Sequence, residues 1–198
     1  MELKEFIRSL HAFHREKNPP SSLFGLGRSQ NIVDLSLIDL DWINQVLFHL
    51  IVRPISKHLF QKTESMDTTL DWYHGYVASY YSPSSSSSSS SKSRLNIHTD
   101  DSEVTLNLCL CNDFEGGNVR FHGLRGDPES EEEYEPRMGM GLLHSGRHFH
   151  EVTNVTKGER FVYILWTRSW SGTRHKTCPC CWLNRRQDES CICDWKWN

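Results

Sequence analysis

The sequence predicts a mainly β protein with flanking helices, an α+β fold class, and three observations support this prediction. Apolar residues recur at helical spacing in residues 1–17 and again in residues 36–62, and this periodicity favours helices. Residues 72–81 are rich in strand-forming aromatic side chains. From Val104 onward apolar and polar residues alternate, as in a strand with one buried face. We therefore expect N-terminal helices that support a β core.

An amphipathic helix begins the predicted N-terminal helical support region, residues 1–70. Charged residues separate its apolar positions, which are Leu3, Phe6, Ile7, Leu10 and Phe13. The run Asn18-Pro19-Pro20 ends this helix, because proline cannot continue it.

Residues 36–62 form the second predicted helix, with Asp39 and Asp41 near its start. Its most apolar stretch is Leu47 to Val52, which we expect to be buried. The stretch is interrupted by His49 and stops before Arg53-Pro54, so it is far too short to span a membrane.

The predicted core, residues 71–170, begins with a strand over residues 72–81, on which Tyr76 and Tyr80 share one face. A low-complexity loop follows at residues 82–93, with serine at every position from 84 to 91. Such a loop buries no apolar surface, so we expect disorder unless substrate or phosphorylation orders it. Its place before the next motif suggests a lid, and a neutral loop expansion is the alternative.

The strand from Val104 places Thr105, Asn107 and Cys109 on its more polar face. Gly116-Gly117 suits a hairpin turn before residues 118–121. Residues 125–137 contain three consecutive glutamates and suggest a solvated loop, with attraction of a basic substrate as the alternative. Residues 155–160 suggest a strand, a turn containing Gly158 and a second strand.

Four residues indicate a metal site. In a strand, alternate side chains point the same way, so His98 and Asp100 can reach one metal while Thr99 turns aside. With His150 they supply two imidazoles and one carboxylate, half of an octahedral iron site with the other half open. Arg160 follows His150 by ten residues, which places a guanidinium beside the same pocket. A lone H-x-D is a weak signal, and the prediction depends on the ordered set.

Three blocks of sequence, HTDDSEVTLNLCL, FEGGNVRFHG and GLLHSGRHFHEVTNVTKGERFVYILW, lie within about residues 95–168. Here the chain resembles the iron(II)- and 2-oxoglutarate-dependent dioxygenases, especially the prolyl and lysyl hydroxylases. The resemblance implies a double-stranded β-helix of the jelly-roll or cupin-like kind. It also implies His98, Asp100 and His150 as iron ligands and Arg160 as the partner of the 2-oxoglutarate C5 carboxylate. Ascorbate is a candidate reductant.

Several neighbouring residues compete for or extend these roles. His144 and His148 lie on the same segment as His150, but the resemblance aligns the ligand with His150. Asn107 is the best hydrogen-bonding candidate on the face expected to line the 2-oxoglutarate pocket. The resemblance suggests that Tyr76 or Tyr80 bonds the cosubstrate, with aromatic packing as the alternative.

The expected reaction is hydroxylation coupled to decarboxylation of 2-oxoglutarate to succinate and CO2. Asp100 favours hydroxylation, because a related halogenase would need a small residue there for chloride. A protein prolyl or lysyl side chain is the expected substrate, with a small molecule or nucleobase as the alternative. Two other hypotheses are a non-catalytic sensor of iron and 2-oxoglutarate and a zinc-stabilised interaction protein.

Composition limits the class of protein. With 198 residues, 37% of them hydrophobic, we expect one catalytic domain. A net charge of −3 argues against nonspecific nucleic-acid binding, which needs clustered cations. The charged N-terminal residues resemble neither a signal peptide nor a membrane anchor, so we expect a cytoplasmic or nuclear protein without a membrane partner.

The last predicted region, residues 171–198, is rich in cysteine and tryptophan. Four thiolates can bind a structural zinc ion, but the C-x-C-C and C-x-C spacings lack the usual C-x-x-C, so buried thiols and disulfides stay open. Trp182, Trp195 and Trp197 either cap the core or form a recognition surface. The candidate zinc ligands are Cys178, Cys180, Cys181, Cys191 and Cys193.

Overall fold

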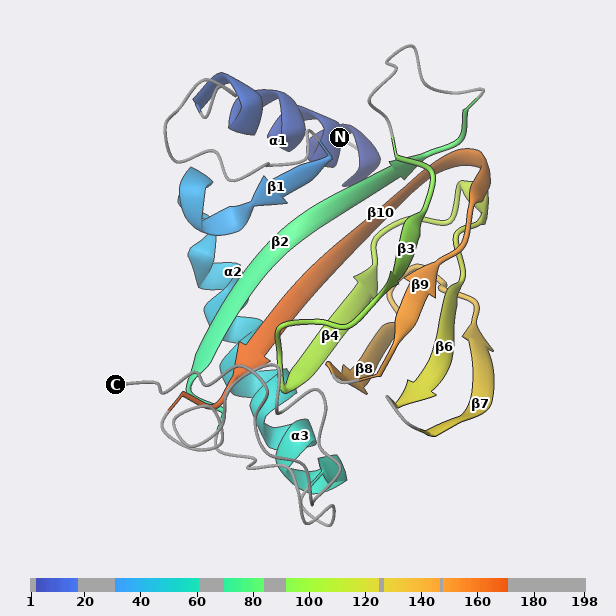
Figure 1. Ribbon diagram of the computed structural model, residues 1–198. Helices are drawn as coiled ribbons and strands as arrows, with labels where there is room; N and C mark the ends of the chain where they lie inside the picture. The colour runs from blue at the N-terminus through green and yellow to red at the C-terminus, as the bar shows by residue number, and fades with distance from the viewer. Residues whose placement is uncertain are drawn as a thin grey trace, which may run out of the picture.

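Two antiparallel sheets face each other in the computed structural model, and helices cover the outer face of the larger sheet (Figure 1). The structure describes residues 3–17, 31–60, 70–83, 92–124, 127–146 and 148–170. The predictions for the serine run at 84–91 and for the cysteine-rich residues 171–198 lie outside these residues. Within the described segments, no helix is long and apolar enough to cross a membrane.

The larger sheet has the strand order β1-β2-β10-β4-β8, with β5 paired to β10, and the smaller has the order β3-β9-β6-β7. This arrangement confirms the mainly β prediction and the double-stranded β-helix. The strands are β1 (Ile32–Asp34), β2 (Trp72–Tyr81), β3 (Leu95–His98), β4 (Val104–Cys109), β5 (Phe114–Gly116), β6 (Val119–Leu124), β7 (Asp127–Tyr134), β8 (Gly141–Ser145), β9 (His150–Val152) and β10 (Val155–Arg168).

The two faces of the larger sheet carry separate cores. On β10, Phe161 and Leu165 pack toward the helices together with Phe48 and Val77. Val162 and Ile164 point the other way, into a second cluster between the sheets. This alternation follows from the two-residue period of a strand, and it leaves the inner face of β2 and β10 to line a pocket.

Helix α1 (Leu3–Lys17) confirms the first predicted helix, but its buried face differs from the predicted one. Its buried residues are Ile7, His11 and His14, whereas Leu3, Phe6 and Phe13 are exposed. The ring of His11 shares a hydrogen bond with the Ser79 hydroxyl of β2, which satisfies a buried polar group. A sequence count of apolar residues therefore missed the two histidines of the packed face.

The second predicted helix is split. A 3-10 turn, η1 (Leu35–Ile38), ends at Asp39 in the left-handed conformation with φ of 60°. Helix α2 (Asp41–Leu47), the π-helical turn η2 (Phe48–Val52) and α3 (Arg53–Phe60) then follow one another. Burial of Leu47 to Val52 was only partly correct, because Phe48 and Val52 are buried while Leu50 is 68% exposed.

Two turn predictions, at Gly116-Gly117 and at Gly158, and one loop prediction, at residues 125–137, were wrong. Gly116-Gly117 is not a hairpin turn: it joins β5, which pairs with β10, to β6, which pairs with β7 and β9. The loop predicted at 125–137 contains strand β7, whose glutamates form an outer strand of the smaller sheet. Such charged edge strands resist unwanted pairing.

The predicted turn at Gly158 lies inside the single strand β10. Gly158 has φ of +74°, and a Cβ there would lie 2.0 Å from the carbonyl oxygen of Asp113. Glycine tolerates this positive φ, so β10 continues through a local irregularity at Gly158 and does not turn back. Two residues later, Arg160 points to the inner face of the sheet.

Candidate metal and cosubstrate site

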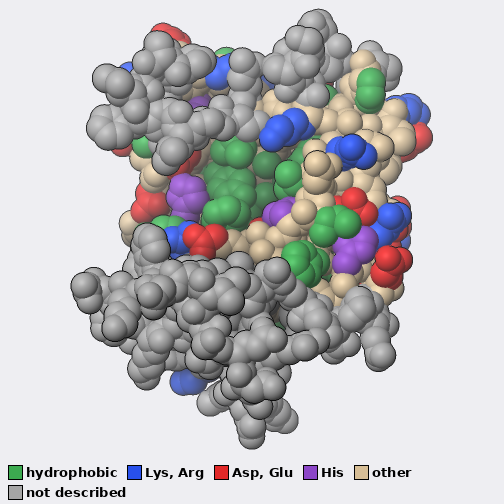
Figure 2. Space-filling model, in the orientation of Figure 1, with side chains coloured by type: hydrophobic (Ala, Val, Ile, Leu, Met, Phe, Trp, Pro, Cys, Tyr) green, Lys and Arg blue, Asp and Glu red, His purple; other side chains and the backbone are tan. Residues whose placement is uncertain are grey.

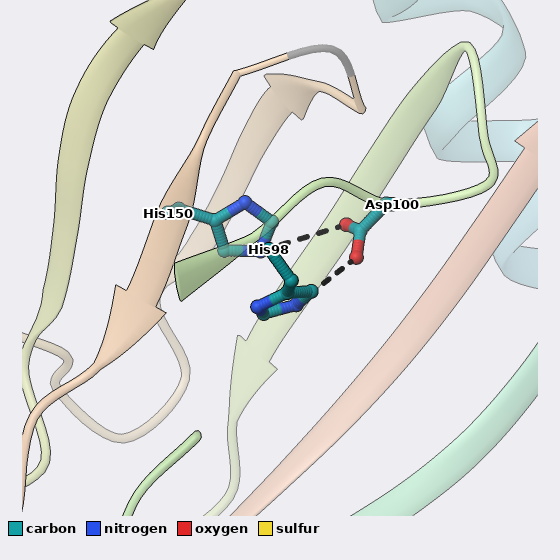
Figure 3. A group of neighbouring side chains, drawn as sticks. All are labelled: His98, Asp100 and His150. Atoms are coloured by element: carbon teal, nitrogen blue, oxygen red, sulfur yellow. Dashed lines mark ion pairs between the residues drawn. The ribbon is translucent and has the colours of Figure 1, made fainter. Parts of the chain in front are cut away.

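Two imidazoles and a carboxylate converge between the sheets (Figure 3). His98 ends β3 and His150 begins β9, and the two residues are cross-strand partners. Asp100 follows β3 by two residues, and its backbone N–H donates to the carbonyl oxygen of Gly146 at 2.9 Å. Antiparallel pairing therefore brings together residues that lie about fifty positions apart in the sequence.

The three side chains are close enough to share one ion. The Asp100 carboxylate oxygens lie 3.5 Å from His98 Nε2 and 3.7 Å from His150 Nε2. All three potential ligand atoms lie within 4.8 Å of one another. Two nitrogens and one carboxylate, with space left beside them, are the donor set that suits a non-haem iron(II) with open positions.

The backbone orients both rings. His98 Nδ1 lies 2.8 Å from the carbonyl oxygen of Asn96, and His150 Nδ1 lies 3.0 Å from that of His148. A proton on each Nδ1 donates to these carbonyls and leaves the Nε2 lone pairs facing Asp100. Such hydrogen bonds set the tautomer and direction of metal-binding histidines.

The charge states of Asp100 and His150 also suit a metal. Burial raises the pKa of Asp100, but the interactions with His98, His150 and His144 and the hydrogen bond from Thr105 outweigh it, so this pKa lies below its usual value. Burial holds the pKa of His150 below its usual value despite the charge of Asp100. An ionised carboxylate and a neutral imidazole are the forms that bind metals.

Three further side chains surround Asp100: Thr105 from the predicted polar strand face, His144 from the segment of His150, and Ser102, which was not among the residues predicted from the sequence. The Thr105 hydroxyl donates to Asp100 Oδ2 at 2.7 Å and lies 2.6 Å from the Ser102 hydroxyl. His144 Nε2 lies 3.8 Å from Asp100 Oδ2 and 2.9 Å from the amide nitrogen of Asn107. The H-x-D motif followed five residues later by a threonine on the polar strand face was the available sequence signal for Thr105.

Arg160 lines the same pocket as the His98, Asp100 and His150 cluster. Its side chain is buried, and Nε and Nη1 have no hydrogen-bond partner. Its guanidinium lies 5.4 Å from the ring centre of Tyr80. Burial lowers the pKa of Arg160, while nearby tyrosines and cysteines oppose the shift, and a guanidinium stays charged at neutral pH. A buried, unpaired cationic fork fits the carboxylate of a 2-oxo dicarboxylic acid.

One pocket contains most of the residues selected from the sequence: His98, Asp100, Asn107, His150, Arg160, Tyr76 and Tyr80. Burial raises the pKa of both tyrosines, so their hydroxyls remain protonated donors. Apolar side chains complete the lining: Leu95, Val119, Val152, Val162 and Ile164. His148 instead lies against Phe121, at 6.0 Å between ring centres.

Comparisons with known proteins agree with this chemistry. The sequence profile of the 2OG-Fe(II) oxygenase superfamily matches residues 85–168. The chain is 37% identical over 138 residues to the 2-oxoglutarate and iron-dependent oxygenase domain-containing protein CP2 of Arabidopsis thaliana, a match covering 66% of this chain and 33% of that protein. It is 41% identical over 75 residues to the multifunctional procollagen lysine hydroxylase and glycosyltransferase LH3 of Rattus norvegicus, covering 35% of this chain and 9% of that protein.

A solved structure shares the fold. The structure of a prolyl 4-hydroxylase from Phytophthora capsici aligns with a TM-score of 0.56 at 17% identity, covering 86% of this chain and 54% of that one. The profile match over residues 85–168 and the Arabidopsis relative support the 2OG-Fe(II) oxygenase superfamily for this chain. The chain spans about a third of the length of the Arabidopsis relative.

Proposed function

We propose that this protein is an iron(II)- and 2-oxoglutarate-dependent dioxygenase that hydroxylates a prolyl or lysyl side chain of a protein. The observation that carries the proposal is the cluster of His98, Asp100 and His150 in one pocket with the unpaired guanidinium of Arg160. A metal-binding set alone would suit many functions. An added cationic fork at the far end of the pocket favours a dicarboxylate cosubstrate.

The metal-binding residues and Arg160 have separate roles. His98, Asp100 and His150 hold iron through one face and leave three positions open. Arg160 binds the distal carboxylate of 2-oxoglutarate. Iron(II) and 2-oxoglutarate, when bound, supply the oxidation of a substrate C–H bond to C–OH, with dioxygen consumed and 2-oxoglutarate converted to succinate and CO2.

The remaining pocket residues orient the cosubstrate and keep water out. Tyr76, Tyr80 and Asn107 line the pocket with polar groups, and we propose that they hydrogen-bond the cosubstrate. Val162 and Ile164 form an apolar wall, and exclusion of water limits unproductive oxidation. Asp100 occupies the third ligand position, and its presence favours hydroxyl transfer over halogenation.

The choice of a protein side chain as substrate has support of a different kind. The names of the rat relative and of the Phytophthora structure refer to lysine and proline hydroxylation. A protein substrate also agrees with a net charge of −3, which disfavours a polyanionic nucleic acid. The pocket residues themselves are compatible with either amino acid.

An anaerobic titration tests the proposal. Metal-free protein is titrated with iron(II) and 2-oxoglutarate while the visible charge-transfer band of a chelated 2-oxo acid is followed. We expect a band in the wild type and none in Asp100→Ala. Succinate release in air, with ascorbate as reductant, then measures turnover. A well-folded wild type without the band would overturn the proposal, and a band without turnover on any peptide would favour the sensor hypothesis.

A further inference from the structure

One face of the helical segment 41–60, formed by α2, η2 and α3, is apolar and exposed. The opposite face is buried, and its residues Phe48 and Val52 belong to the core on the helix side of the larger sheet. Monomers rarely expose many large apolar side chains side by side, so the exposed face indicates a contact surface. We call its six large apolar side chains, each 40–68% exposed, the apolar stripe: Trp42, Val46, Leu50, Ile51, Ile55 and Leu59.

The π-helical turn η2 keeps the buried and exposed faces apart. The buried residues Asn44, Phe48, Val52 and Ser56 follow one another at intervals of four. In a regular α-helix with 3.6 residues per turn, such a row drifts around the axis and would leave the sheet. The wider turn at η2 takes up an extra residue and corrects this drift. The stripe therefore stays on the outer side of a helix roughly 30 Å long.

The spacing of the stripe is the same from either end. Successive members are four, four, one, four and four residues apart. A helix with this symmetry can pair antiparallel with a copy of itself about a two-fold axis, because residue i then contacts residue j while j contacts i. With the axis between Leu50 and Ile51, the outer members pair across it in the same way, so that Val46 of one copy meets Ile55 of the other.

Charges along the segment favour the same antiparallel arrangement. Asp39 and Asp41 lie at its N-terminal end, Arg53 and Lys57 lie in its C-terminal half, and residues 39–60 contain no other Asp, Glu, Lys or Arg. Antiparallel pairing sets the acidic end of one copy beside the basic end of the other. Parallel pairing would oppose like charges, which is costly in an interface. A second copy of this chain therefore matches the stripe in spacing and in charge.

Pairing through the stripe leaves the pocket accessible. Phe161 and Leu165 of β10 pack toward the helices, whereas Val162 and Ile164 line the pocket from the inner face of the same strand. Figure 2 shows hydrophobic side chains gathered in a hollow over β2 and β10 on the side that faces the viewer, and the helices cover the other face of this sheet (Figure 1). A copy docked on the helices would not close the pocket.

The size of the stripe sets the expected affinity. An exposed apolar patch of this kind covers on the order of a few hundred Å². A standard protein interface buries roughly 800 Å² per partner. We therefore expect a reversible dimer with a dissociation constant in the micromolar range and not a permanent one.

We infer that the apolar stripe is a homodimer interface, in which the helical segments 41–60 of two copies pair antiparallel about a two-fold axis between Leu50 and Ile51. The inference is independent of the proposed hydroxylase function, because it uses no residue of the pocket. Each dimer carries two accessible pockets.

Sedimentation equilibrium of the full chain, from about 1 µM to about 1 mM, tests the inference. We expect a reversible equilibrium between monomer and dimer. Leu50→Glu brings two like charges together at the axis and should raise the dissociation constant at least tenfold. Leu50 is 68% exposed, so the fold should be unchanged, which circular dichroism and thermal unfolding check. Met138→Glu is the matched control, because Met138 is 49% exposed outside the stripe, and it should change the dissociation constant less than twofold.

A complementary pair of substitutions tests the orientation. Val46→Glu and Ile55→Lys each place an unpaired charge in the interface and should weaken dimerisation about tenfold. Combined in one chain, they set the added carboxylate of one copy against the added ammonium of the other. The double variant should therefore dimerise at least threefold more tightly than either single variant, because contacting positions are coupled.

Three results would overturn the inference. Wild type that stays monomeric at every concentration would leave the stripe to a different partner. Unchanged dimerisation in Leu50→Glu, or an equal loss in Met138→Glu, would place the interface elsewhere. A double variant no tighter than the single variants would contradict the antiparallel pairing.

Discussion

At the scale of single residues, Thr105 is as informative as the proposed metal ligands. Its hydroxyl donates to Asp100 Oδ2 and is buried beside the Ser102 hydroxyl. Thr105→Val keeps the shape but removes the donor, so we expect iron(II) affinity to fall roughly 10- to 100-fold, the usual cost of losing a partner that orients a ligand. Thr105→Ser should retain most of the affinity. Metal titration measures both, and equal affinity in Thr105→Val and wild type would contradict the assigned role.

Arg160 provides a second residue-scale prediction. Arg160→Lys keeps a positive charge but loses the planar fork. We expect 2-oxoglutarate to bind at least tenfold more weakly, a loss of about 1.4 kcal/mol, while iron(II) binds as in wild type. The charge-transfer titration measures the first quantity and metal titration the second. A parallel loss of iron affinity would instead indicate a structural role for the guanidinium.

Two short intervals in the sequence made the candidate site residues recognisable, and the structure places these residues in one pocket. His98 and Asp100 are two residues apart at the end of β3, and the ten-residue interval from His150 to Arg160 runs along β9 and β10. His144 was harder to place, since its contacts with Asp100 and Asn107 depend on pairing between β4 and β8. Ser102 had no sequence signal of its own, because its contact with Thr105 comes from the tertiary structure.

At the scale of elements, His11 couples the packing of α1 on β2 to pH. Burial lowers the pKa of His11 from 6.5 to about 4, with smaller contributions from Arg15 and His14. Between these values the unfolded chain binds the extra proton and the folded one does not, so stability falls as pH drops from 6.5 toward 4. The maximum loss is roughly 3 kcal/mol.

Denaturant unfolding of wild type and His11→Gln at pH 7 and pH 4.5 measures this effect. Glutamine can hydrogen-bond Ser79 without titrating in this range. We expect the variant to lose less stability than wild type over this pH interval. Equal losses would show that other groups control the acid sensitivity.

At the same scale, two glycines with positive φ allow the stability cost of backbone strain to be separated from that of a steric clash. Gly158 and Gly139 have φ of +74° and +79°, but a Cβ would lie 2.0 Å from the Asp113 carbonyl oxygen at Gly158 and meet nothing within 4 Å at Gly139. Gly139→Ala should cost about 1 kcal/mol from its backbone conformation alone. Gly158→Ala should cost at least about 3 kcal/mol, because clash adds to strain. Denaturant unfolding measures both, and equal costs would contradict the clash.

Long strands were easier to predict than the connections between them. The aromatic run at 72–81 and the alternation from Val104 correspond to β2 and β4, because local pattern and tertiary burial agree there. The acidic run at 131–133 suggests a loop from sequence alone, because charge favours exposure to solvent. It lies instead in β7, where Arg120 binds Glu133 and backbone pairing with β6 supplies the order.

At the scale of the whole molecule, the pocket joins the two sheets. His98 and His150 belong to the smaller sheet and Arg160 to the larger one, while Asp100 lies in the connection from β3 to β4. An iron ion bound without 2-oxoglutarate would contact only the smaller sheet and this connection. A 2-oxoglutarate held by both iron and Arg160 would link the two sheets across the inner hydrophobic cluster.

This arrangement predicts cooperative stabilisation by ligands. Under anaerobic conditions, iron(II) and 2-oxoglutarate at about 100 times their dissociation constants should together add at least roughly 2.7 kcal/mol, which raises the Tm of a domain of this size by about 5 to 11 °C. Scanning calorimetry should show a joint shift larger than the sum of the separate shifts, because 2-oxoglutarate lacks its metal contact when iron is absent. Arg160→Lys should keep the iron shift and lose most of the added increment, and Asp100→Ala should lose both. A joint shift equal to the sum would show that the two ligands do not link the sheets.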